Sequence, residues 1–311
     1  MSWAQQGCNR VSAAAVATLD ASQSALEAAV PDPNVLIEFR NVYKSFGDKP
    51  ILQGASFKIR RGEAVGIIGA SGTGKSTTLR IAAGLLAPDS GEVLILGKQR
   101  FGLLSDSNEE ENLRVGMVFQ NAALFDSLTV GENVGFLLYE HSKLPVPQIR
   151  KLVEQSLASV GLRGVEKLYP SELSGGMKKR VALARAVVSD VKGEQEQVLM
   201  YDEPTAGLDP VASTVVEDLM RNLHKNNSSS NNMSIEGSEA ASRKAIPNKG
   251  ISSYIVVTHQ HSTIRRAVDR IIFLHDGKVV WQGPVEEFDT TDEPIVRQFA
   301  EGTLDGPIAY V

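Results

Sequence analysis

The sequence predicts an α/β domain with a mostly parallel core sheet, and three observations support this. Short apolar runs have the length and composition of strands buried on both faces, at residues 64–68, 198–201 and 254–257. Segments with helical spacing alternate with these runs, at about residues 76–86, 146–160, 174–188 and 211–224. A glycine-rich turn follows the first run at once. Strands and helices that alternate in this way form a parallel sheet with helices packed on its faces.

The chain before the first of these runs has the pattern of antiparallel strands. Residues 35–39 alternate between apolar and polar side chains, turn-forming residues occupy positions 47–50, and a second strand-like segment follows at 51–59. We therefore expect an antiparallel β subdomain at the start of the folded region.

Composition limits the classes of function that the chain can have. Its 311 residues are 42% hydrophobic and 22% charged, which is enough for a sizeable core. The net charge of -5 does not predict a nucleic-acid partner, and we interpret the basic cluster at 178–180 as a solvated helix face. The only cysteine is Cys8, so an internal disulfide is excluded. No window reaches the ~18 to 20 apolar residues of a membrane-spanning helix, so a membrane role would need another protein as anchor.

Two segments have a different composition from the rest. Residues 1–33 are rich in Ala and Ser and have no acidic residue before Asp20, which predicts a disordered tail or the remnant of a transit peptide. Residues 225–250 are dominated by Asn, Ser, Lys, Glu and Gly. Such a segment buries too little apolar surface to offset its ordering entropy, so we predict a disordered insertion there.

Residues 69–76 match the phosphate-binding pattern G-x-x-x-x-G-K-[ST], and they stand between a predicted strand and a predicted helix. The glycines let backbone N–H groups turn toward a phosphate, and the helix N-terminus adds its positive dipole end. We expect Lys75 to reach the β and γ phosphates and the Ser76 hydroxyl to bind Mg²⁺. Outside this context the match could be a plain glycine turn with a surface lysine. The predicted nucleotide-binding residues of this segment are Gly69, Ala70, Ser71, Gly72, Thr73, Gly74, Lys75, Ser76 and Thr77.

Two adjacent carboxylates follow the apolar run at 198–201. Asp202 is expected to hold the Mg²⁺ shell, and Glu203 to face an attacking water molecule. A strand that ends in two acids could also simply face solvent. The phosphate loop in the same chain favours the catalytic interpretation.

Further motifs occur in the order in which the ABC ATPases carry them. Residues 173–177, Leu-Ser-Gly-Gly-Met, resemble the signature motif of that family. Four more features resemble its glutamine loop, D-loop, switch histidine and adenine-stacking aromatic: residues 118–120, residues 206–209, His259 and Phe46. Each alone has an ordinary explanation, such as a helix cap at Ser174. The ordered set spans residues 35 to about 288 and favours the family.

The resemblance implies a P-loop NTPase of the ABC ATPase type over residues 35–288. Its core sheet is accompanied by the antiparallel β subdomain and by a helical subdomain that carries the signature motif. The implied catalytic residues are Glu203 as general base with His259, Gln120 and Lys75, and the implied Mg²⁺ ligands are Ser76, Gln120 and Asp202. Phe46 would stack on adenine. In this family the signature helix completes the ATP site of a second copy, which implies a head-to-tail dimer around two ATP molecules. The residues expected to act there are Ser174, Gly175, Gly176 and Asp209.

A narrower resemblance comes from the signature and the C-terminus. Met177 replaces the usual glutamine of the signature, and residues 295–299 are followed by Gly302 and by Asp-Gly-Pro at 305–307. These features are similar to the ATPases of Mla-type phospholipid transporters, including the chloroplast trigalactosyldiacylglycerol importer. Four longer stretches are similar to the chloroplast branch: residues 123–128, 132–140, 172–185 and 257–263.

The narrower resemblance implies ATP-driven lipid transport through a separate multi-span permease, with a lipid-binding substrate protein in the same complex. Residues 289–311 would form a C-terminal tail of the Mla type. The implied location is the stromal face of the chloroplast inner envelope, or the cytoplasmic face of a bacterial inner membrane. The N-terminus is shorter and less rich in Ser than a full plastid presequence, which is a departure from the chloroplast branch.

Residues 121–140 are partly apolar, and we predict that they dock a helix of the permease, although the same side chains could pack within the helical subdomain. One other function fits the motifs alone. A soluble single-domain ABC ATPase of iron–sulfur cluster assembly would also lack membrane spans.

Overall fold

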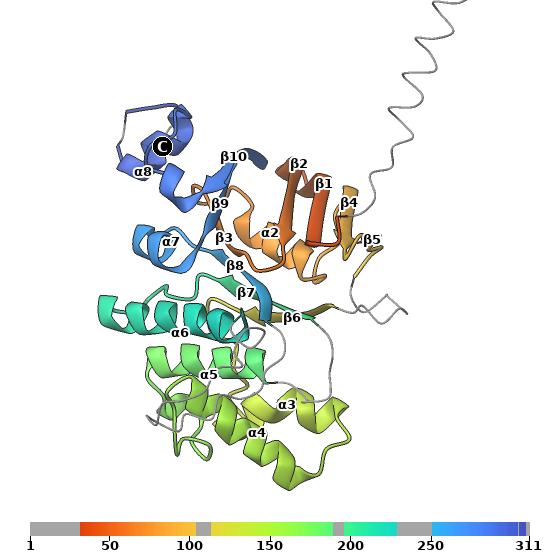
Figure 1. Ribbon diagram of the computed structural model, residues 1–311, viewed down its shortest axis with the longest axis vertical. Coiled ribbons are helices and arrows are strands. Elements are labelled where there is room, and N and C mark those ends of the chain that lie inside the picture. Colours follow the sequence, from red (N-terminus) through yellow and green to blue (C-terminus); the bar gives the residue numbers. More distant parts are fainter. Residues whose placement is uncertain (1–31, 104–112, 189–195, 229–250, 304, 309–311) are drawn as a thin grey trace, which may run out of the picture.

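The computed structural model describes residues 32–103, 113–188, 196–228, 251–303 and 305–308. Figure 1 shows two β-sheets in the upper part of the molecule and a group of helices below them. The predicted tail at 1–33 lies outside these residues except for its last two positions, and the predicted insertion lies outside them from residue 229 onward.

The first sheet is antiparallel, as predicted from the alternating pattern. β1 (Val35–Phe46) and β2 (Lys49–Arg60) form a long hairpin, and the strand order is β2-β1-β4-β5. The other two strands are β4 (Ser90–Ile95) and β5 (Lys98–Gln99). Phe39 and Phe57 stack across the hairpin with ring centroids 4.4 Å apart, which adds an aromatic pair to the strand pairing.

The second sheet has the order β10-β9-β3-β8-β7-β6. Its strands are β3 (Ala64–Ile68), β6 (Leu113–Val118), β7 (Glu196–Asp202), β8 (Ile251–Val257), β9 (Arg270–His275) and β10 (Lys278–Pro284). The pairs within β9-β3-β8-β7-β6 are all parallel, and β10 joins β9 antiparallel. The prediction of a mostly parallel core sheet is confirmed.

Alternate residues of the parallel strands enter two different hydrophobic clusters. Ile68 of β3 and Tyr201 of β7 pack in the cluster that includes the lower helices. Ile67 and Met200, their chain neighbours, pack in the cluster shared with the antiparallel sheet and helix α2. Because successive strand residues point to opposite faces, the continuous apolar runs are explained by burial on both sides.

The α-helices are α2 (Lys75–Ala82), α3 (Val130–His141), α4 (Val146–Ser159), α5 (Gly175–Val187), α6 (Pro210–Ser228), α7 (His261–Ala267) and α8 (Pro294–Glu301). The described residues also form the short 3-10 helices η2 (Pro170–Glu172) and η4 (Val285–Glu287). Helices α3, α4 and α5 form the lower layer in Figure 1, and α6 lies between this layer and the sheet. None of these helices is long and apolar enough to cross a membrane, in the part of the chain that the structure describes.

Two predicted boundaries were wrong. Helix α2 ends at Ala82 rather than near residue 86, because Gly84 adopts a φ of 73° and the N–H of Leu85 turns back to the Arg80 carbonyl. Helix α6 continues to Ser228, so residues 225–228 of the predicted disordered insertion are helical. An amphipathic helix that packs on the sheet can extend into a polar sequence for another turn.

The C-terminal residues fold back onto the core sheet. Phe299 of α8 meets Phe273 of β9 edge to face, with ring centroids 5.2 Å apart. The buried side chain of Gln298 accepts a hydrogen bond from the Ile308 N–H at 2.7 Å and donates to the Ile308 carbonyl at 3.0 Å. The described part of this segment is therefore a packed extension of the domain.

Candidate functional site

The loop between β3 and α2 requires glycine at its two ends. A Cβ on Gly69 would stand 2.1 Å from the carbonyl oxygen of Leu274, and the φ of Gly69 is +146°. A Cβ on Gly74 would stand 2.9 Å from the Leu52 side chain, again with a positive φ of +96°. The loop is thus pressed against β9 and β2, and its backbone can take this path only with glycine at these positions.

Lys75 is folded into this loop. Its Nζ donates to the carbonyl oxygens of Gly69 at 2.9 Å and Ala70 at 2.8 Å, and only 8% of the residue is exposed. Burial lowers the pKa of this ammonium group, and the carboxylates of Glu203 and Asp202 act in the opposite direction. A cation held by carbonyls at the N-terminus of a helix is suited to an anionic ligand such as a phosphate.

Ser76 and Asp202 meet at the end of the core sheet. The Ser76 hydroxyl donates to Oδ1 of Asp202 at 2.8 Å, although 126 positions separate the two residues. Asp202 is buried. A hydroxyl and a carboxylate at this distance are hard oxygen ligands of the type that Mg²⁺ prefers, so the residues present fit that ion.

Glu203 and His259 form a second pair beside the first. Oε1 of Glu203 is 2.8 Å from Nδ1 of His259, whose side chain is 61% exposed. The other carboxylate oxygen, Oε2, is buried and has no hydrogen-bond partner among the described residues. A buried carboxylate oxygen without a partner is costly, and it has the capacity to accept a proton or a hydrogen bond from a ligand.

The parallel register explains why these residues converge. Val118 of β6 pairs with Tyr201 of β7, and Asp202 pairs with Val257 of β8. Gln120, Glu203 and His259 each follow one of these strands within two residues. Since β3, β8, β7 and β6 are consecutive in the sheet, their carboxyl ends bring the phosphate loop, both carboxylates, the histidine and Gln120 to one edge.

Phe46 lies on the neighbouring antiparallel sheet. Its ring is half exposed at the end of β1, and Nζ of Lys44 stands 5.8 Å from the ring centroid. The hairpin that carries Phe46 reaches the phosphate loop through Ile51 and Leu52, which contact the space beside Gly74. An exposed aromatic ring can stack on a planar base, and this role of Phe46 stays a prediction.

The signature residues belong to a different part of the surface. Ser174 caps α5, and Asp209 caps α6 through the N–H groups of Val211 at 3.0 Å and Ala212 at 2.9 Å. Both caps border a cavity of about 350 Å³, which is lined by Ser174, Gly175, Gly176, Arg180, Gly207, Leu208, Asp209, Ala212, Val215 and Val216. No residue of the phosphate loop lines it. One chain therefore presents two separate sets of candidate residues, one around Lys75 and one around Ser174.

The predicted docking segment is only half exposed. Leu124 and Leu138 pack into the core of the lower helical layer, whereas Phe125 is 46% and Leu137 is 44% exposed. The ring of Phe125 rests against Phe136, with centroids 5.0 Å apart.

The sequence analysis did not predict the burial of one cationic side chain. Lys179 was assigned to a solvated helix face, but it is 8% exposed, and its Nζ donates to the carbonyl oxygens of Gln120 and Glu203. The burial of Lys179 could have been predicted from the sequence, because the apolar residues Ala182, Leu183 and Ala186, which are buried, follow it at helical spacing.

Comparison with known proteins decides the family. The family model described as ABC transporter matches residues 52–206. A protein of Arabidopsis thaliana, TRIGALACTOSYLDIACYLGLYCEROL 3, chloroplastic, is 64% identical over 281 residues, which cover 90% of this chain and 77% of the relative. The chain belongs to the ABC transporter ATP-binding family. Its members are ATPases, and this chain is an ATPase of that family.

Three further similarities extend the comparison. The intermembrane phospholipid transport system ATP-binding protein MlaF of Escherichia coli K12 is 34% identical over 88% of this chain and 92% of its own. Among solved structures, a dimeric ATP-binding cassette in a post-hydrolysis state with ADP and Pi superimposes with a TM-score of 0.63 at 27% identity, over 80% of this chain and 99% of its own. The protein cbiO1 of Clostridium perfringens, part of the ABC transporter complex cbiONQ, gives a TM-score of 0.66 at 28% identity, over 84% of this chain and 92% of its own. The ABC ATPase fold is thereby confirmed.

Proposed function

We propose that this chain is the ATP-hydrolysing subunit of a lipid transporter, which dimerises around two ATP molecules and drives a separate permease. The observation that carries the catalytic part is the Glu203–His259 pair beside Lys75 and Asp202. The lipid part is supported by the relatives, since the chloroplast protein and the phospholipid transport protein MlaF both align over nearly 90% of the chain.

Hydrolysis in this proposal depends on Glu203. Its Oε2 accepts a proton from the attacking water, while His259 holds Oε1 at 2.8 Å and so fixes the orientation of the carboxylate. Lys75 leaves the loop carbonyls and donates to the phosphates of ATP instead. Ser76, Asp202 and Gln120 would hold Mg²⁺, which when bound neutralises charge on the phosphates. Phe46 stacks on the adenine, and the loop residues from Gly69 to Thr77 surround the phosphates.

The second half of each site comes from a second copy of the chain. Ser174, Gly175 and Gly176 form the N-terminus of α5, whose positive dipole end and free N–H groups suit the γ-phosphate. Asp209 borders the same cavity from α6. The separation of this surface from the phosphate loop in one chain supports a head-to-tail dimer, as does the dimeric state of a solved relative.

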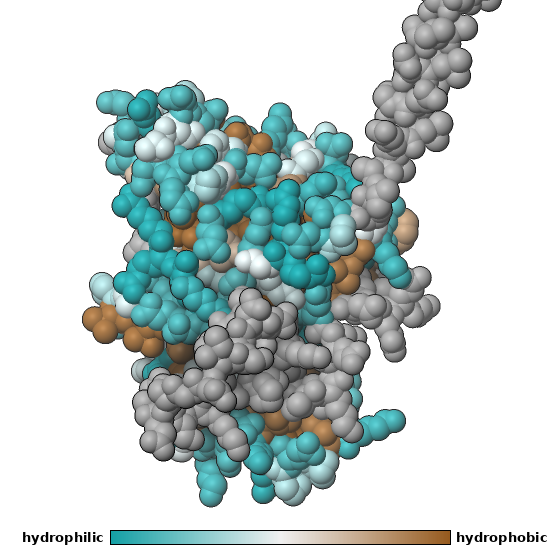
Figure 2. Space-filling model, in the orientation of Figure 1, coloured by the Kyte–Doolittle hydropathy of each residue, from teal (hydrophilic) through white to brown (hydrophobic). Residues whose placement is uncertain are grey.

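A permease partner is supported by the exposed aromatic and aliphatic side chains of the lower layer. Phe125, Leu137 and Tyr139 are each more than a third exposed, and Figure 2 shows hydrophobic surface at the end of the molecule where α3 and α4 lie. We place the chain at the stromal face of the chloroplast inner envelope, held there by the permease, with a lipid-binding substrate protein in the same complex. The chloroplast relative supports this location, and the bacterial relative supports the equivalent cytoplasmic face.

The experiment is affinity purification of the full chain in mild detergent, followed by identification of proteins and lipids in the complex. A multi-span membrane protein in stoichiometric amount, with ATPase activity that responds to phospholipid vesicles, is expected. Recovery with an iron–sulfur scaffold protein and no membrane protein would contradict the lipid proposal and favour the assembly ATPase.

A further inference from the structure

Helix α5 carries a buried cation whose partners belong to two catalytic loops. Lys179 lies five residues after Ser174, and its ammonium group donates to the carbonyl oxygen of Gln120 and, at 3.4 Å, to that of Glu203. Its hydrogen bonds thus go to backbone, although the carboxylates of Asp202 and Glu203 are close enough to favour its charged form. Methionine would fill the same space without the cost of burying a charge, so packing alone does not explain a lysine here.

The Glu203 carbonyl belongs to a backbone that needs support. Glu203 has a φ of +50°, a region that residues other than glycine seldom adopt. Its N–H donates to the Val257 carbonyl at 2.9 Å, and its own carbonyl accepts from Ala206 at 3.2 Å and from Lys179. These three contacts fix the peptide groups on both sides of the Glu203 side chain, so a change at Lys179 alters the direction in which the carboxylate points.

The Gln120 loop is held by the same helix at a second place. Ala122 and Ala123 both have positive φ, 60° and 46°, without being glycine. Their carbonyl oxygens accept hydrogen bonds from Arg185 of α5, at 2.9 Å and 2.7 Å. Two cations of one helix therefore hold consecutive parts of this loop, and only Lys179 also reaches Glu203.

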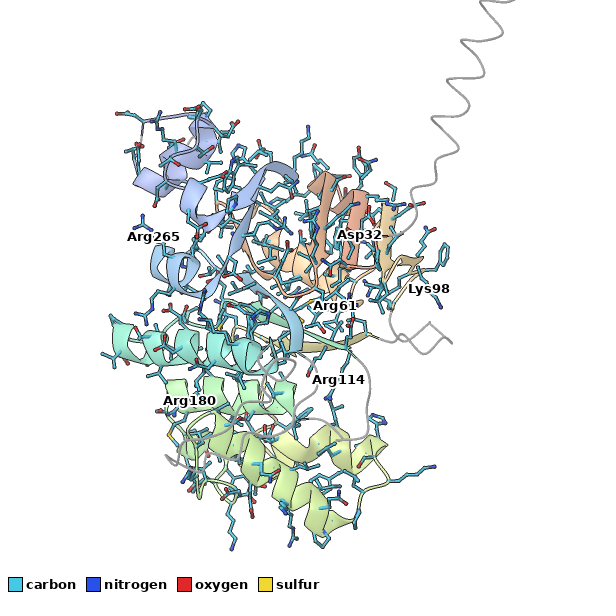
Figure 3. The ribbon with its side chains drawn as sticks, in the orientation of Figure 1. Asp32, Arg61, Lys98, Arg114, Arg180 and Arg265 are labelled. Atoms are coloured by element: carbon cyan, nitrogen blue, oxygen red, sulfur yellow. The ribbon has the colours of Figure 1, made fainter. Side chains whose placement is uncertain are left out.

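Two further hydrogen bonds join the middle and the C-terminal end of α5 to the domain. Arg180 donates to the Gly161 carbonyl at 3.3 Å, and Arg114 of β6 donates to the Val188 carbonyl just after the helix at 2.7 Å; both arginines are labelled in Figure 3. The hydrogen bonds within the helix also keep its residues in fixed positions relative to one another. A displacement at Ser174 then reaches Lys179 and the carbonyls that it holds.

We propose that Lys179 is a positioning residue that couples the signature end of α5 to Glu203 and Gln120 of the same chain. The inference rests on the proposed function: when Ser174 engages the ATP of the second copy, Lys179 holds the Glu203 carboxylate of its own site in the hydrolytic orientation. In the proposed dimer each chain contributes Ser174 to one ATP site and Glu203 to the other. Lys179 thereby links these two sites.

The test compares Lys179→Met, which keeps the length of the side chain and removes the charge, with Lys179→Arg and with Lys151→Met as control. Lys151 is an exposed lysine of the neighbouring helix α4. In the full-length protein we expect Lys179→Met to lower kcat for ATP by at least about ten-fold, while KM and the affinity for ATP change less than about three-fold, because positioning affects the transition state and not binding. Lys179→Arg should recover most of kcat, and Lys151→Met should match the wild type.

A double variant separates positioning from a general structural effect. If Lys179 acts mainly through Glu203, adding Lys179→Met to Glu203→Gln should slow single-turnover hydrolysis much less than Lys179→Met slows the wild type, because only its hold on the Gln120 carbonyl remains to be lost. If it acts elsewhere, the two losses should multiply. An unchanged kcat for Lys179→Met, equal losses in kcat and ATP affinity, or multiplying losses would each overturn the proposal.

Folding is checked by thermal melting. If Lys179→Met does not fold, Lys179→Arg is compared with Lys179→Gln: a higher kcat for Arg at equal KM supports the proposal, whereas equal kcat values, or failure of all variants to fold, assign Lys179 a structural role only. Failure of the proposed function looks different, because the wild type would then not hydrolyse ATP or Glu203→Gln would be as fast as the wild type.

Discussion

The proposed hydrolytic mechanism depends on the carboxylate of Glu203, and Glu203→Gln isolates its charge. Glutamine has the same shape, and its amide can keep the 2.8 Å contact to His259, because Nδ1 of histidine donates or accepts according to its tautomer. The change leaves Lys75, Ser76 and Asp202 untouched, so ATP binding should persist. What is lost is the proton acceptor at Oε2, which has no partner among the described residues.

The expected magnitude follows from this loss. Removal of a positioned general base costs about 10² to 10⁴ in rate, or roughly 3 to 5.5 kcal/mol of transition-state stabilisation. Phosphate release at saturating Mg²⁺ and ATP measures the rate, and light scattering with ATP measures the dimer. We expect slow turnover together with an ATP-stabilised dimer.

A matched control is Glu154→Gln, the same chemical change at an exposed position of α4. It should hydrolyse ATP at the wild-type rate. Turnover by Glu203→Gln that equals this control would refute the assignment of the general base, and loss of ATP binding in Glu203→Gln would refute the claim that the amide preserves the site.

Three further predictions concern the loop, the dimer and a buried histidine. Gly69→Ala should abolish nucleotide binding and lower stability by about 1 to 3 kcal/mol in thermal melts, because the new Cβ would stand 2.1 Å from the Leu274 carbonyl; binding at the wild-type level would contradict the loop geometry. Mixing Lys75→Ala chains with Ser174→Arg chains should restore part of the ATPase activity that each lacks alone, since a mixed dimer has one site with both residues intact. If dilution leaves the rate per chain constant down to the monomer, the trans arrangement is wrong. Burial lowers the pKa of His224 from 6.5, so the unfolded state binds more protons below that pH and stability should fall as pH drops through this range, by at most about 1.4 kcal/mol per pH unit. His224→Phe should show a weaker fall in chemical-denaturation midpoints between pH 7 and 5, and an identical profile would exclude His224 as the source.

The parts of the site that sequence reasoning predicted are those with local causes. The phosphate loop depends on glycines at fixed spacing between one strand and the next helix, so residues 69–76 carry the whole signal. Similarly, each buried strand is a continuous apolar run, and its carboxyl end can be read directly as the position of Asp202 or His259. The register that joins these ends is not local, yet a parallel sheet leaves few alternatives once the strands are known.

Other features depend on contacts between distant residues, which no local pattern encodes. In the sequence Lys179 cannot be told apart from its partly exposed neighbours Lys178 and Arg180, because charged residues usually lie at the surface. Its burial follows from the side of α5 that meets the loops after β6 and β7. The extension of α6 to Ser228 was missed because Asn and Ser have low helix propensity, whereas a long helix can continue into such residues once its earlier turns are formed.

A network of polar side chains joins the loop after β7, which carries Glu203, to the loop after β8, which carries His259. Thr205, two residues after Glu203, donates to Oε1 of Gln260 at 2.8 Å, and Gln260 directly follows His259. Thr263 of α7 donates to the buried Glu217 of α6 at 2.6 Å and lies 3.3 Å from Thr205. Each hydroxyl has a single proton, so this arrangement is satisfied when Thr205 donates to the amide and Thr263 to the carboxylate. Helix α6 begins at the Asp209 cap beside the signature cavity. The loops that carry the base and the histidine are therefore tied to both helices that border that cavity, through Lys179 on α5 and through Glu217 on α6.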